Sequence, residues 1–395
     1  MRLDIFTEVQ KARASWGDDH EQDVIEETIE QARLADELGY ECWWQVEHHG
    51  ATEFSYSSAP ELLLTAISQQ TSRLRLGHSG VLAPFKVNHP IRIAERAATL
   101  DRLSHGRAEI GFARSGGLEW DTFGVDPESS LEQVRQCMQM VKGMWTESPF
   151  SFQSDLFEIP ERNIIPKPLQ QPHPPMWQTT SSPGSFRMAG ELGVGVLATT
   201  LMQPLDVMAM LLDEYRDGLK DCEPVGDFVN NETAVFTFVH CAETTQEAIA
   251  SGAASAAMWY VNSAPAVFKV DPEIFYDSIR GEVLEGAASR ITVLEDGEEA
   301  PASDEQLDDP NPVVRLLRHA AAGREISPEE AYETLDPLDS VIIGDVETCL
   351  RKMQRYKDIG VDRLMCFMQI GDIGHDAIMR SLRITAEELM PALAD

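Results

Sequence analysis

The chain alternates between short strand-like segments and longer helix-like segments along almost its whole length. Apolar or aromatic runs of a few residues are each followed by a stretch whose apolar positions recur with the helical period. The expected strands are 3–6, 40–46, 74–82, 107–112, 175–179, 194–198, 233–241 and 363–369. Parallel strands need a crossover helix between them, so eight such units predict an α/β fold, the (β/α)8 TIM barrel.

An open, doubly wound sheet is the alternative arrangement of the same units. Its phosphate-binding fingerprint, GxGxxG after the first strand, is missing between Phe6 and Ala14. We therefore expect one barrel domain over residues 1–395, with an insertion at 265–339 between the seventh and eighth strands. Within the insertion, residues 292–310 are strongly acidic and contain no Lys or Arg. This composition predicts a partly mobile segment, either a lid or a surface insertion.

Charge and composition exclude several classes of function. The 395 residues include 32 basic and 66 acidic side chains, a formal net charge of −34. This excess argues against binding of nucleic acid or of an anionic membrane surface. No apolar window is long enough to span a bilayer, and the first residues lack the apolar core of a signal peptide. The six cysteines are scattered without CxxC spacing, so we expect a cytoplasmic protein with reduced thiols.

The second expected strand ends in an acid and two histidines, Glu47, His48 and His49. In a barrel, the loops after the strands gather at one face, and active sites are built there. Histidine changes its protonation near neutral pH, so this strand end is a candidate for proton transfer. Adjacent residues on an extended chain point apart, so a metal site made of the two histidines is not expected.

Three other strand ends carry groups suited to a ligand that bears a phosphate. The third strand contains Ser79 and Gly80, and a glycine permits close approach of backbone to a ligand. The fourth is followed by Arg114, whose planar guanidinium suits a phosphate or a carboxylate. The fifth leads into a helix start flanked by Ser182 and Ser185, whose amides and hydroxyls form a phosphate cradle. Together with the histidines, these groups indicate one site at one end of the barrel.

A series of short motifs has the order and spacing seen in a known family. They are EHH at 47–49, RLG at 75–77, HPIRIAE at 89–95, LDRLSHGR at 100–107, GFAR at 111–114, IGD at 343–345, GVDR at 360–363 and SLR at 381–383. In this order they resemble the bacterial-luciferase-like flavin monooxygenases, which are (β/α)8 barrels. The resemblance runs from the first strand to Pro391, interrupted by the acidic insertion.

The resemblance implies roles for the strand-end residues. In the family, the first His of the Glu-His-His run lies beside the flavin ring and assists catalysis, which implies a catalytic Glu47–His48 pair here. A pair of small residues joined by a non-proline cis peptide lies beneath the isoalloxazine ring, and this pair corresponds to Ser79-Gly80.

The resemblance also implies a binding site for the flavin phosphate. The phosphate-binding arginine corresponds to Arg114, and the amides and hydroxyls of the helix start correspond to Ser182 and Ser185. Luciferase carries an acid where Ser181 stands and a reactive cysteine where Ala113 stands. These departures argue against luciferase's own substrate, a long aldehyde.

The implied reaction is that of a two-component FMN-dependent monooxygenase. Reduced FMN (FMNH2) comes from a separate NAD(P)H-flavin reductase, since the chain has no nicotinamide fingerprint, and reacts with O2 to give a C4a-peroxyflavin. This adduct, protected in a dry pocket, oxygenates a small, largely apolar organic substrate. We expect His78, Trp120, Trp177 and Phe85 to line the substrate pocket. We also expect a homodimer, because dimers are common among relatives.

Two other functions are compatible with the same barrel. The first is an F420-dependent oxidoreductase that transfers hydride. That deazaflavin has a longer acidic tail and requires more basic residues, so the acidic character of the chain favours FMN. The second is a non-catalytic flavin-binding protein, against which the retained pair Glu47 and His48 argues.

Overall fold

The computed structural model describes residues 1–283 and 307–394 of the chain. Within these ranges, eight parallel strands close into a barrel, which confirms the predicted (β/α)8 fold. β1 pairs with β2 on one side and with β11 on the other, and β8 pairs with β9, so the ring closes. The barrel strands are β1 (Arg2–Thr7), β2 (Cys42–Gln45), β3 (Arg75–Leu82), β4 (Ala108–Ala113), β7 (Met176–Thr179), β8 (Gly195–Thr199), β9 (Thr233–Ala242) and β11 (Arg363–Phe367).

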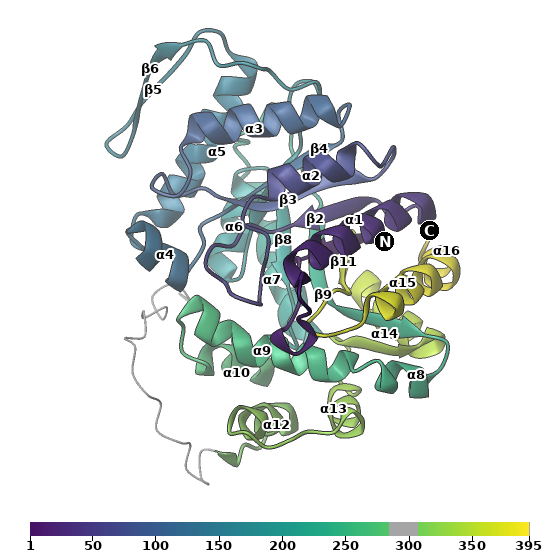
Figure 1. The fold of residues 1–395 in the computed structure, drawn as a ribbon. Helices are drawn as coiled ribbons and strands as arrows, with labels where there is room; N and C mark the ends of the chain where they lie inside the picture. Colours follow the sequence, from purple (N-terminus) through teal and green to yellow (C-terminus); the bar gives the residue numbers. More distant parts are fainter. Residues whose placement is uncertain (284–306, 395) are drawn as a thin grey trace.

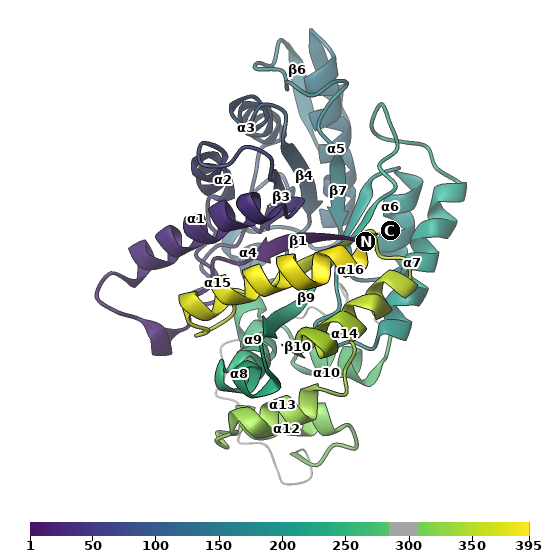
Figure 2. The same cartoon turned by 90° about the vertical axis from the view of Figure 1, so that its right-hand side faces the viewer.

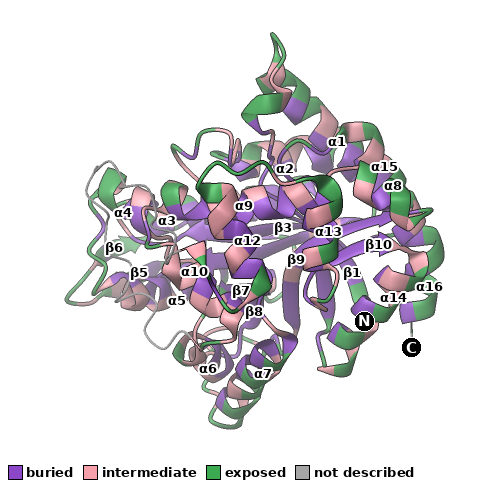
Figure 3. Cartoon of the chain, turned by 90° about the horizontal axis from the view of Figure 1, so that it is seen from below, coloured by how far each residue is buried: buried purple, intermediate pink, exposed green. Residues whose placement is uncertain are grey.

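Helices surround the barrel and separate its strands along the chain (Figure 1, Figure 2). Their buried faces lie against the strands and their exposed faces point outward, as Figure 3 shows. The helices of the repeating units are α1 (His20–Leu38), α2 (Pro60–Ser68), α3 (Pro90–Leu103), α5 (Ser130–Thr146), α6 (Pro183–Glu191), α7 (Leu205–Lys220), α14 (Val346–Asp358) and α15 (His375–Ile384). The additional helices are α4 (Gly117–Phe123), α8 (Thr245–Ala250), α9 (Ala253–Phe268), α10 (Glu273–Arg280), α12 (Pro312–Ala321), α13 (Pro328–Leu335) and α16 (Met390–Leu393), with single turns η1 (Arg13–Ser15) and η3 (Thr385–Leu389).

Three strands in the described ranges lie outside the eight that the sequence predicts. β5 (Phe150–Gln153) and β6 (Glu158–Arg162) form an antiparallel hairpin that projects from the top of the molecule in Figure 1. Only Phe150 and Ile159 of this hairpin are buried, so it lacks a strong apolar alternation. β10 (Ile342–Asp345) pairs with the last residues of β9, beyond the level at which β9 pairs with β8 and β11.

The segment expected as an insertion lies between β9 and β11. Its described part contains helices and no strand: the end of α9, then α10, α12 and α13. Asp309, from the end of the acidic stretch, lies 2.6 Å from Arg280 and 3.4 Å from Arg318. Residues 292–306, on which the prediction of a mobile lid or surface insertion rests, lie outside the described residues.

Two tryptophans fill the interior of the barrel. Trp44 from β2 and Trp177 from β7 meet edge to face, with ring centroids 5.3 Å apart. Glycines on neighbouring strands make room for them: a Cβ on Gly77 would lie 2.0 Å from the Trp44 ring, and one on Gly195 would lie 2.3 Å from the Trp177 ring. The packed interior means that a ligand binds at the rim of the barrel rather than inside it.

A cluster of charges lies at the amino-terminal end of the barrel strands. Arg363, the first residue of β11, lies 3.1 Å from Glu109, 3.8 Å from Asp4 and 2.6 Å from Glu232. Arg75, the first residue of β3, also forms an ion pair with Glu109. We call these five residues the floor cluster.

The two chain ends lie side by side in Figures 1 and 2. The amino group of Met1 donates to the carbonyl of Leu393 at 3.3 Å. Helices α8 and α9 are separated at Gly252, whose φ is +75°. In the described part of the chain, no helix combines the length and apolar character needed to cross a lipid bilayer.

Candidate active site

A cavity of about 730 Å³ opens at the carboxyl-terminal end of the barrel strands. A volume of this order accommodates a cofactor or a substrate of moderate size. Its wall brings together residues that follow strands far apart in the sequence. All the expected catalytic and cofactor-binding residues line it, namely Glu47, His48, Ser79, Gly80, Arg114, Ser182 and Ser185.

His48 lies between two buried carboxylates. Its Nδ1 is 3.0 Å from Glu119 Oε1, and its Nε2 is 3.6 Å from Glu8 Oε2. Burial lowers the pKa of His48, but the negative charges of Glu8 and Glu119 outweigh burial and raise the pKa to about 8. The imidazole is therefore mostly protonated at neutral pH, which suits a proton donor.

Glu47 has both of its carboxylate oxygens engaged. Its Oε1 accepts from Asn88 Nδ2 at 2.9 Å and lies 3.2 Å from His49 Nε2, and its Oε2 accepts from the amide of Leu82 at 3.0 Å. Burial acts to raise the pKa of Glu47, but the hydrogen bond from His49 and the nearby imidazole of His78 outweigh it and hold the pKa below its usual range. Glu47 is therefore ionised, and its hydrogen bonds connect the end of β2 to β3 and to the segment before α3.

Arg114 supplies a fixed positive charge to the cavity wall. Its guanidinium lies over the ring of Trp120, 4.9 Å from the ring centroid, and its Nη2 donates to the carbonyl of Pro127 at 3.3 Å. Its Nε is buried without a hydrogen-bond partner, and burial lowers its pKa with no carboxylate of the described chain to offset the effect. A half-buried cation without an ion-pair partner in the described residues indicates a site for an external anion.

Helix α6 begins at the same cavity. Ser182 is its N-cap residue and Pro183 is its first residue, and the Ser185 hydroxyl accepts from the amide of Ser182 at 3.0 Å. A Cβ on Gly184 would meet open space. The first turn of a helix presents amide groups without intrahelical partners and the positive end of the helix dipole, so this end of the cavity also favours an anion.

Several buried oxygens on the cavity wall have no hydrogen-bond partner in the described residues. They are Glu8 Oε2 after β1, Gln178 Oε1 in β7, Thr180 Oγ1 after β7 and Thr199 Oγ1 at the end of β8. Buried polar atoms in folded proteins almost always have partners. Their number here indicates that a polar ligand completes the site.

Ser79 and Gly80 are joined by a non-proline cis peptide bond, as the family resemblance implies. The backbone is tightly enclosed at this point. A Cβ on Gly80 would lie 3.0 Å from Thr179 Oγ1 and 3.1 Å from the backbone nitrogen of Ala113.

The expected substrate-pocket residues His78, Trp120, Trp177 and Phe85 do not line the cavity. Trp177 lies inside the barrel, and Trp120 lies behind Arg114, where its Nε1 donates to the Arg114 carbonyl at 2.8 Å. These two predictions were wrong because an aromatic residue near a strand end can point into the barrel or behind the loop, and residue type does not decide which.

The other two expected pocket residues also have different positions. His78 is buried, with its Nε2 3.6 Å from Glu47 Oε2. Phe85 packs on Phe157, with ring centroids 4.4 Å apart. Phe157 comes from the turn between β5 and β6, a hairpin that the sequence did not predict, so this contact was not foreseeable.

Sequence reasoning missed three residues of the site: Glu8, Glu119 and Tyr260. Glu8 directly follows β1, so the strand-end argument that selected Glu47 could also have found it. Glu119 lies on α4, a short helix with no marked pattern. Tyr260 lies on α9 and donates its hydroxyl to Glu8 Oε1 at 3.1 Å across a separation of 252 residues, which only the tertiary structure reveals.

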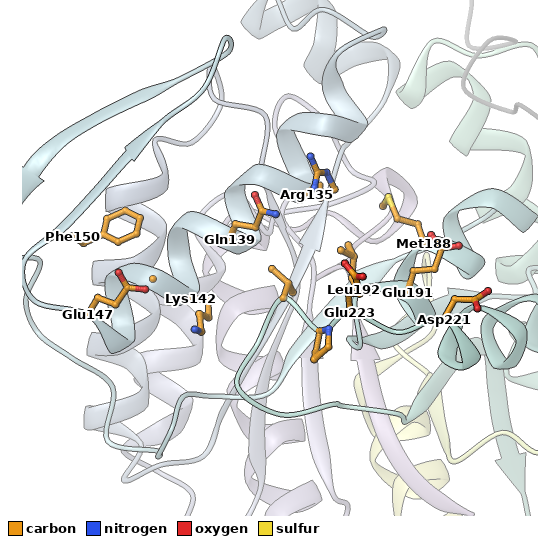
Figure 4. A pocket seen from close by; sticks show the side chains of 13 residues that line it. Arg135, Gln139, Lys142, Glu147, Phe150, Met188, Glu191, Leu192, Asp221 and Glu223 are labelled. Carbon is orange, nitrogen blue, oxygen red and sulfur yellow. The ribbon is translucent and has the colours of Figure 1, made fainter.

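A second hollow, of about 630 Å³, lies between α5, α6 and the segment after α7 (Figure 4). Its cations already have partners: Arg135 lies 2.6 Å from Glu132, and Lys142 lies 2.7 Å from Asp227. Its wall also carries four carboxylates, those of Glu147, Glu191, Asp221 and Glu223. This hollow is therefore unsuited to a phosphate. Among the residues described, no group of three or more His, Cys, Asp or Glu could hold a metal ion.

Comparison with known proteins identifies the family. The family model described as luciferase-like monooxygenase matches residues 1–363. The chain therefore belongs to the luciferase-like monooxygenases, and it is an oxidoreductase that depends on a flavin.

A curated relative matches along the whole chain. The oxygenase component of the flavin-dependent trigonelline monooxygenase from Acinetobacter baylyi is 25% identical over 398 residues, which cover 100% of this chain and 96% of the relative.

Solved structures share the fold at lower identity. The oxygenating constituent of 3,6-diketocamphane monooxygenase from Pseudomonas putida, in complex with FMN, has a TM-score of 0.72 and 17% identity, covering 100% of this chain and 99% of that chain. The F420-dependent tetrahydromethanopterin reductase from Methanopyrus kandleri has a TM-score of 0.67 and 17% identity, covering 100% of both chains.

Proposed function

We propose that this protein is the oxygenase component of a two-component system, which uses reduced FMN and O2 to insert one oxygen atom into a small organic substrate. The observation that carries the proposal is the position of Arg114, a half-buried cation that has no carboxylate partner in the described residues and lines the same cavity as His48. The relative from Acinetobacter, named an oxygenase component, supports a separate partner that reduces the flavin. We infer that this partner is an NAD(P)H-flavin reductase.

The cavity wall has the groups that FMN requires. Arg114 and the first turn of α6, with Ser182 and Ser185, would hold the phosphate. Ser79-Gly80 and His48 would face the ring system. The unpartnered oxygens on the wall would accept hydrogen bonds from ring and ribityl donors. When bound, reduced FMN supplies the two electrons with which O2 delivers one oxygen atom to the substrate and the other to water.

His48 is suited to moving a proton in this cavity. The carboxylate of Glu119 holds a proton on Nδ1, so Nε2 is the atom that gains or releases a proton. The raised pKa of about 8 means that Nε2 carries a proton in most molecules at neutral pH. The residue is thus suited to protonating an oxygen at the reacting centre.

Apolar side chains exclude water from the remaining wall. Phe6, Leu82, Phe112, Leu197 and Phe236 all line the cavity. A dry cavity favours transfer of oxygen to the substrate over release of hydrogen peroxide.

The charge of the cavity wall favours FMN over F420 as the cofactor. Arg114 is the only Lys or Arg among the described residues that line the cavity, and the longer acidic tail of F420 would require more positive charge. The position of His48 beside Glu8 and Glu119 argues against a non-catalytic flavin-binding protein, because flavin binding alone does not require an imidazole whose pKa is raised by two carboxylates.

A cofactor titration followed by oxygen transfer tests the proposal. Quenching of tryptophan fluorescence under anaerobic conditions should report tighter binding of reduced FMN than of reduced F420. After admission of O2, bound reduced FMN should release hydrogen peroxide more slowly than free reduced FMN. Mass spectrometry should find one oxygen atom from ¹⁸O2 in an accepted substrate. Tighter binding of F420, or unchanged peroxide release, would contradict the proposal.

A further inference from the structure

The carboxylate of Glu8 is not fully used by the contacts within the protein. Its Oε1 accepts the hydroxyl of Tyr260 at 3.1 Å. Its Oε2 has no hydrogen-bond partner in the described residues, and its closest charged neighbour is His48 Nε2 at 3.6 Å, beyond hydrogen-bonding distance. Glu8 is 2% exposed and lines the cavity, so its free oxygen is a buried acceptor that an occupant of the cavity can reach.

Two groups of charges lie at the cavity. Arg114 and the start of α6 provide positive charge. Glu8 and Glu119 flank a single imidazole, that of His48. With His48 protonated and both carboxylates ionised, these three residues have a net charge of −1, which favours a cation beside Glu8.

Aromatic side chains share the cavity wall with Glu8. Phe6 and Glu8 both line the cavity, and Phe6 stacks on Phe236 with centroids 3.9 Å apart. Phe268 meets His48 at a centroid distance of 5.0 Å. Phe6, Phe236, Phe268 and Tyr260 all line the cavity. A carboxylate beside several aromatic faces is the arrangement that binds an organic cation.

We propose that Glu8 selects the substrate by binding a protonated amine, so that the oxygenated molecule is a small organic ammonium ion with an apolar body. The inference rests on the proposed function, since it assigns the substrate class of the same cavity. The sequence predicts a largely apolar substrate. The inference adds that one nitrogen of this substrate carries a positive charge, while the rest of the molecule is apolar. Burial raises the pKa of Glu8, and an ammonium group beside Oε2 would favour the ionised form.

Binding of three probes of equal size tests the inference. Benzylammonium, benzyl alcohol and benzoate share a ring and differ in charge. Isothermal titration of the flavin-free protein should show at least about tenfold tighter binding of benzylammonium than of benzyl alcohol, the expected worth of a charge-assisted hydrogen bond. Benzoate should bind more weakly than either. Equal binding of benzylammonium and benzyl alcohol to the unmodified protein would overturn the inference.

Variants then test whether Glu8 causes the preference for benzylammonium over benzyl alcohol. Glu8→Gln keeps the shape of the side chain and should abolish the preference for benzylammonium. Tyr260→Phe removes the partner of Oε1 but keeps the carboxylate, and should retain the preference. Glu161→Gln, an exposed acid on β6, removes the same charge far from the cavity and should also retain it. A preference that survives in Glu8→Gln would overturn the assignment. If Glu8→Gln does not fold, Glu8→Asp, which withdraws the carboxylate by one methylene, should lose affinity for benzylammonium alone.

A parallel titration with FMN keeps this inference separate from the proposed function. If Glu8→Gln weakens FMN as much as benzylammonium, Glu8 serves the flavin and the inference fails. If the unmodified protein binds no FMN, the proposed function fails, while the measured preference for the ammonium probe stands by itself.

Discussion

Buried carboxylates occur at both ends of the barrel, and the two groups differ in the cations that accompany them. At the amino-terminal end, Asp4 and Glu109 of the floor cluster face the guanidinium of Arg363. At the carboxyl-terminal end, Glu8 and Glu119 face the imidazole of His48. Asp4, in β1, lies at the amino-terminal end, and Glu8, the residue directly after β1, lies at the carboxyl-terminal end.

This difference in cation predicts a structural role for the floor cluster and a chemical role for the group of Glu8, Glu119 and His48 at the rim. Arginine remains protonated at every pH at which proteins are stable, so the two cations of the floor cluster keep their charge. Histidine exchanges its proton near neutral pH, so the charge at the rim can change during a reaction. We therefore expect changes to the floor to affect stability and changes to the rim to affect turnover.

The largest effect on stability is expected from Arg363→Leu. The change leaves Asp4 and Glu109 buried beside one remaining cation, Arg75, and should lower the free energy of unfolding by about 3 to 5 kcal/mol. Urea denaturation measures the loss. The control Arg351→Leu removes an exposed arginine, paired with Asp339 at 3.2 Å, and should cost less than about 1 kcal/mol. Equal losses in the two variants would contradict the structural role of the floor.

The largest effect on activity is expected from His48→Ala. Loss of the proton donor should slow turnover by about 100-fold or more, while FMN affinity stays nearly unchanged. Steady-state oxygenation and a flavin titration measure the two quantities. The control His319→Ala, on α12 away from the cavity, should retain full turnover. Unchanged turnover in His48→Ala would remove this residue from the mechanism.

The pH dependence of stability sharpens the comparison. The pKa of His48 in the folded protein is about 8, above its ordinary value of 6.5. Protonated His48 therefore stabilises the fold fully below pH 6.5, and this contribution is lost as the pH rises through about 8. The difference in free energy of unfolding between the unmodified protein and His48→Gln should shrink by about 2 kcal/mol across this range. A difference independent of pH would show that Glu8 and Glu119 do not hold the proton.

The smallest effect is expected from Arg114→Ala. Arg114 resembles the floor arginines in its fixed charge but lies at the rim without an acidic partner in the described chain. Its loss should weaken FMN by about tenfold, the worth of one charge-assisted hydrogen bond, and leave riboflavin, which lacks the phosphate, unaffected. Fluorescence titration with both flavins measures this. Arg162→Ala, an exposed arginine on β6, is the matched control, and equal weakening of both flavins would place Arg114 away from the phosphate.

Strand-end reasoning found part of the site because it depends on local features. His48 and Arg114 each follow an apolar run that forms a barrel strand, and the carboxyl ends of all these strands lie at one face. The same reasoning failed for Trp177, which fills the barrel beside Trp44. Whether a bulky side chain points into the barrel or toward the cavity depends on the space left by facing glycines, such as Gly195, and this space is set by other strands.

The sequence by itself determined the order of the strands and helices, the barrel they form and the face at which the site lies. These features follow from periodicities within a few residues and from the need for crossover helices between parallel strands. Only the tertiary structure decided which acids His48 meets, since Glu119 is 71 residues away in the chain and comes from a helix without a marked pattern. It also decided that Glu8 keeps one oxygen free, because hydrogen bonding of a buried group depends on every element that packs around it.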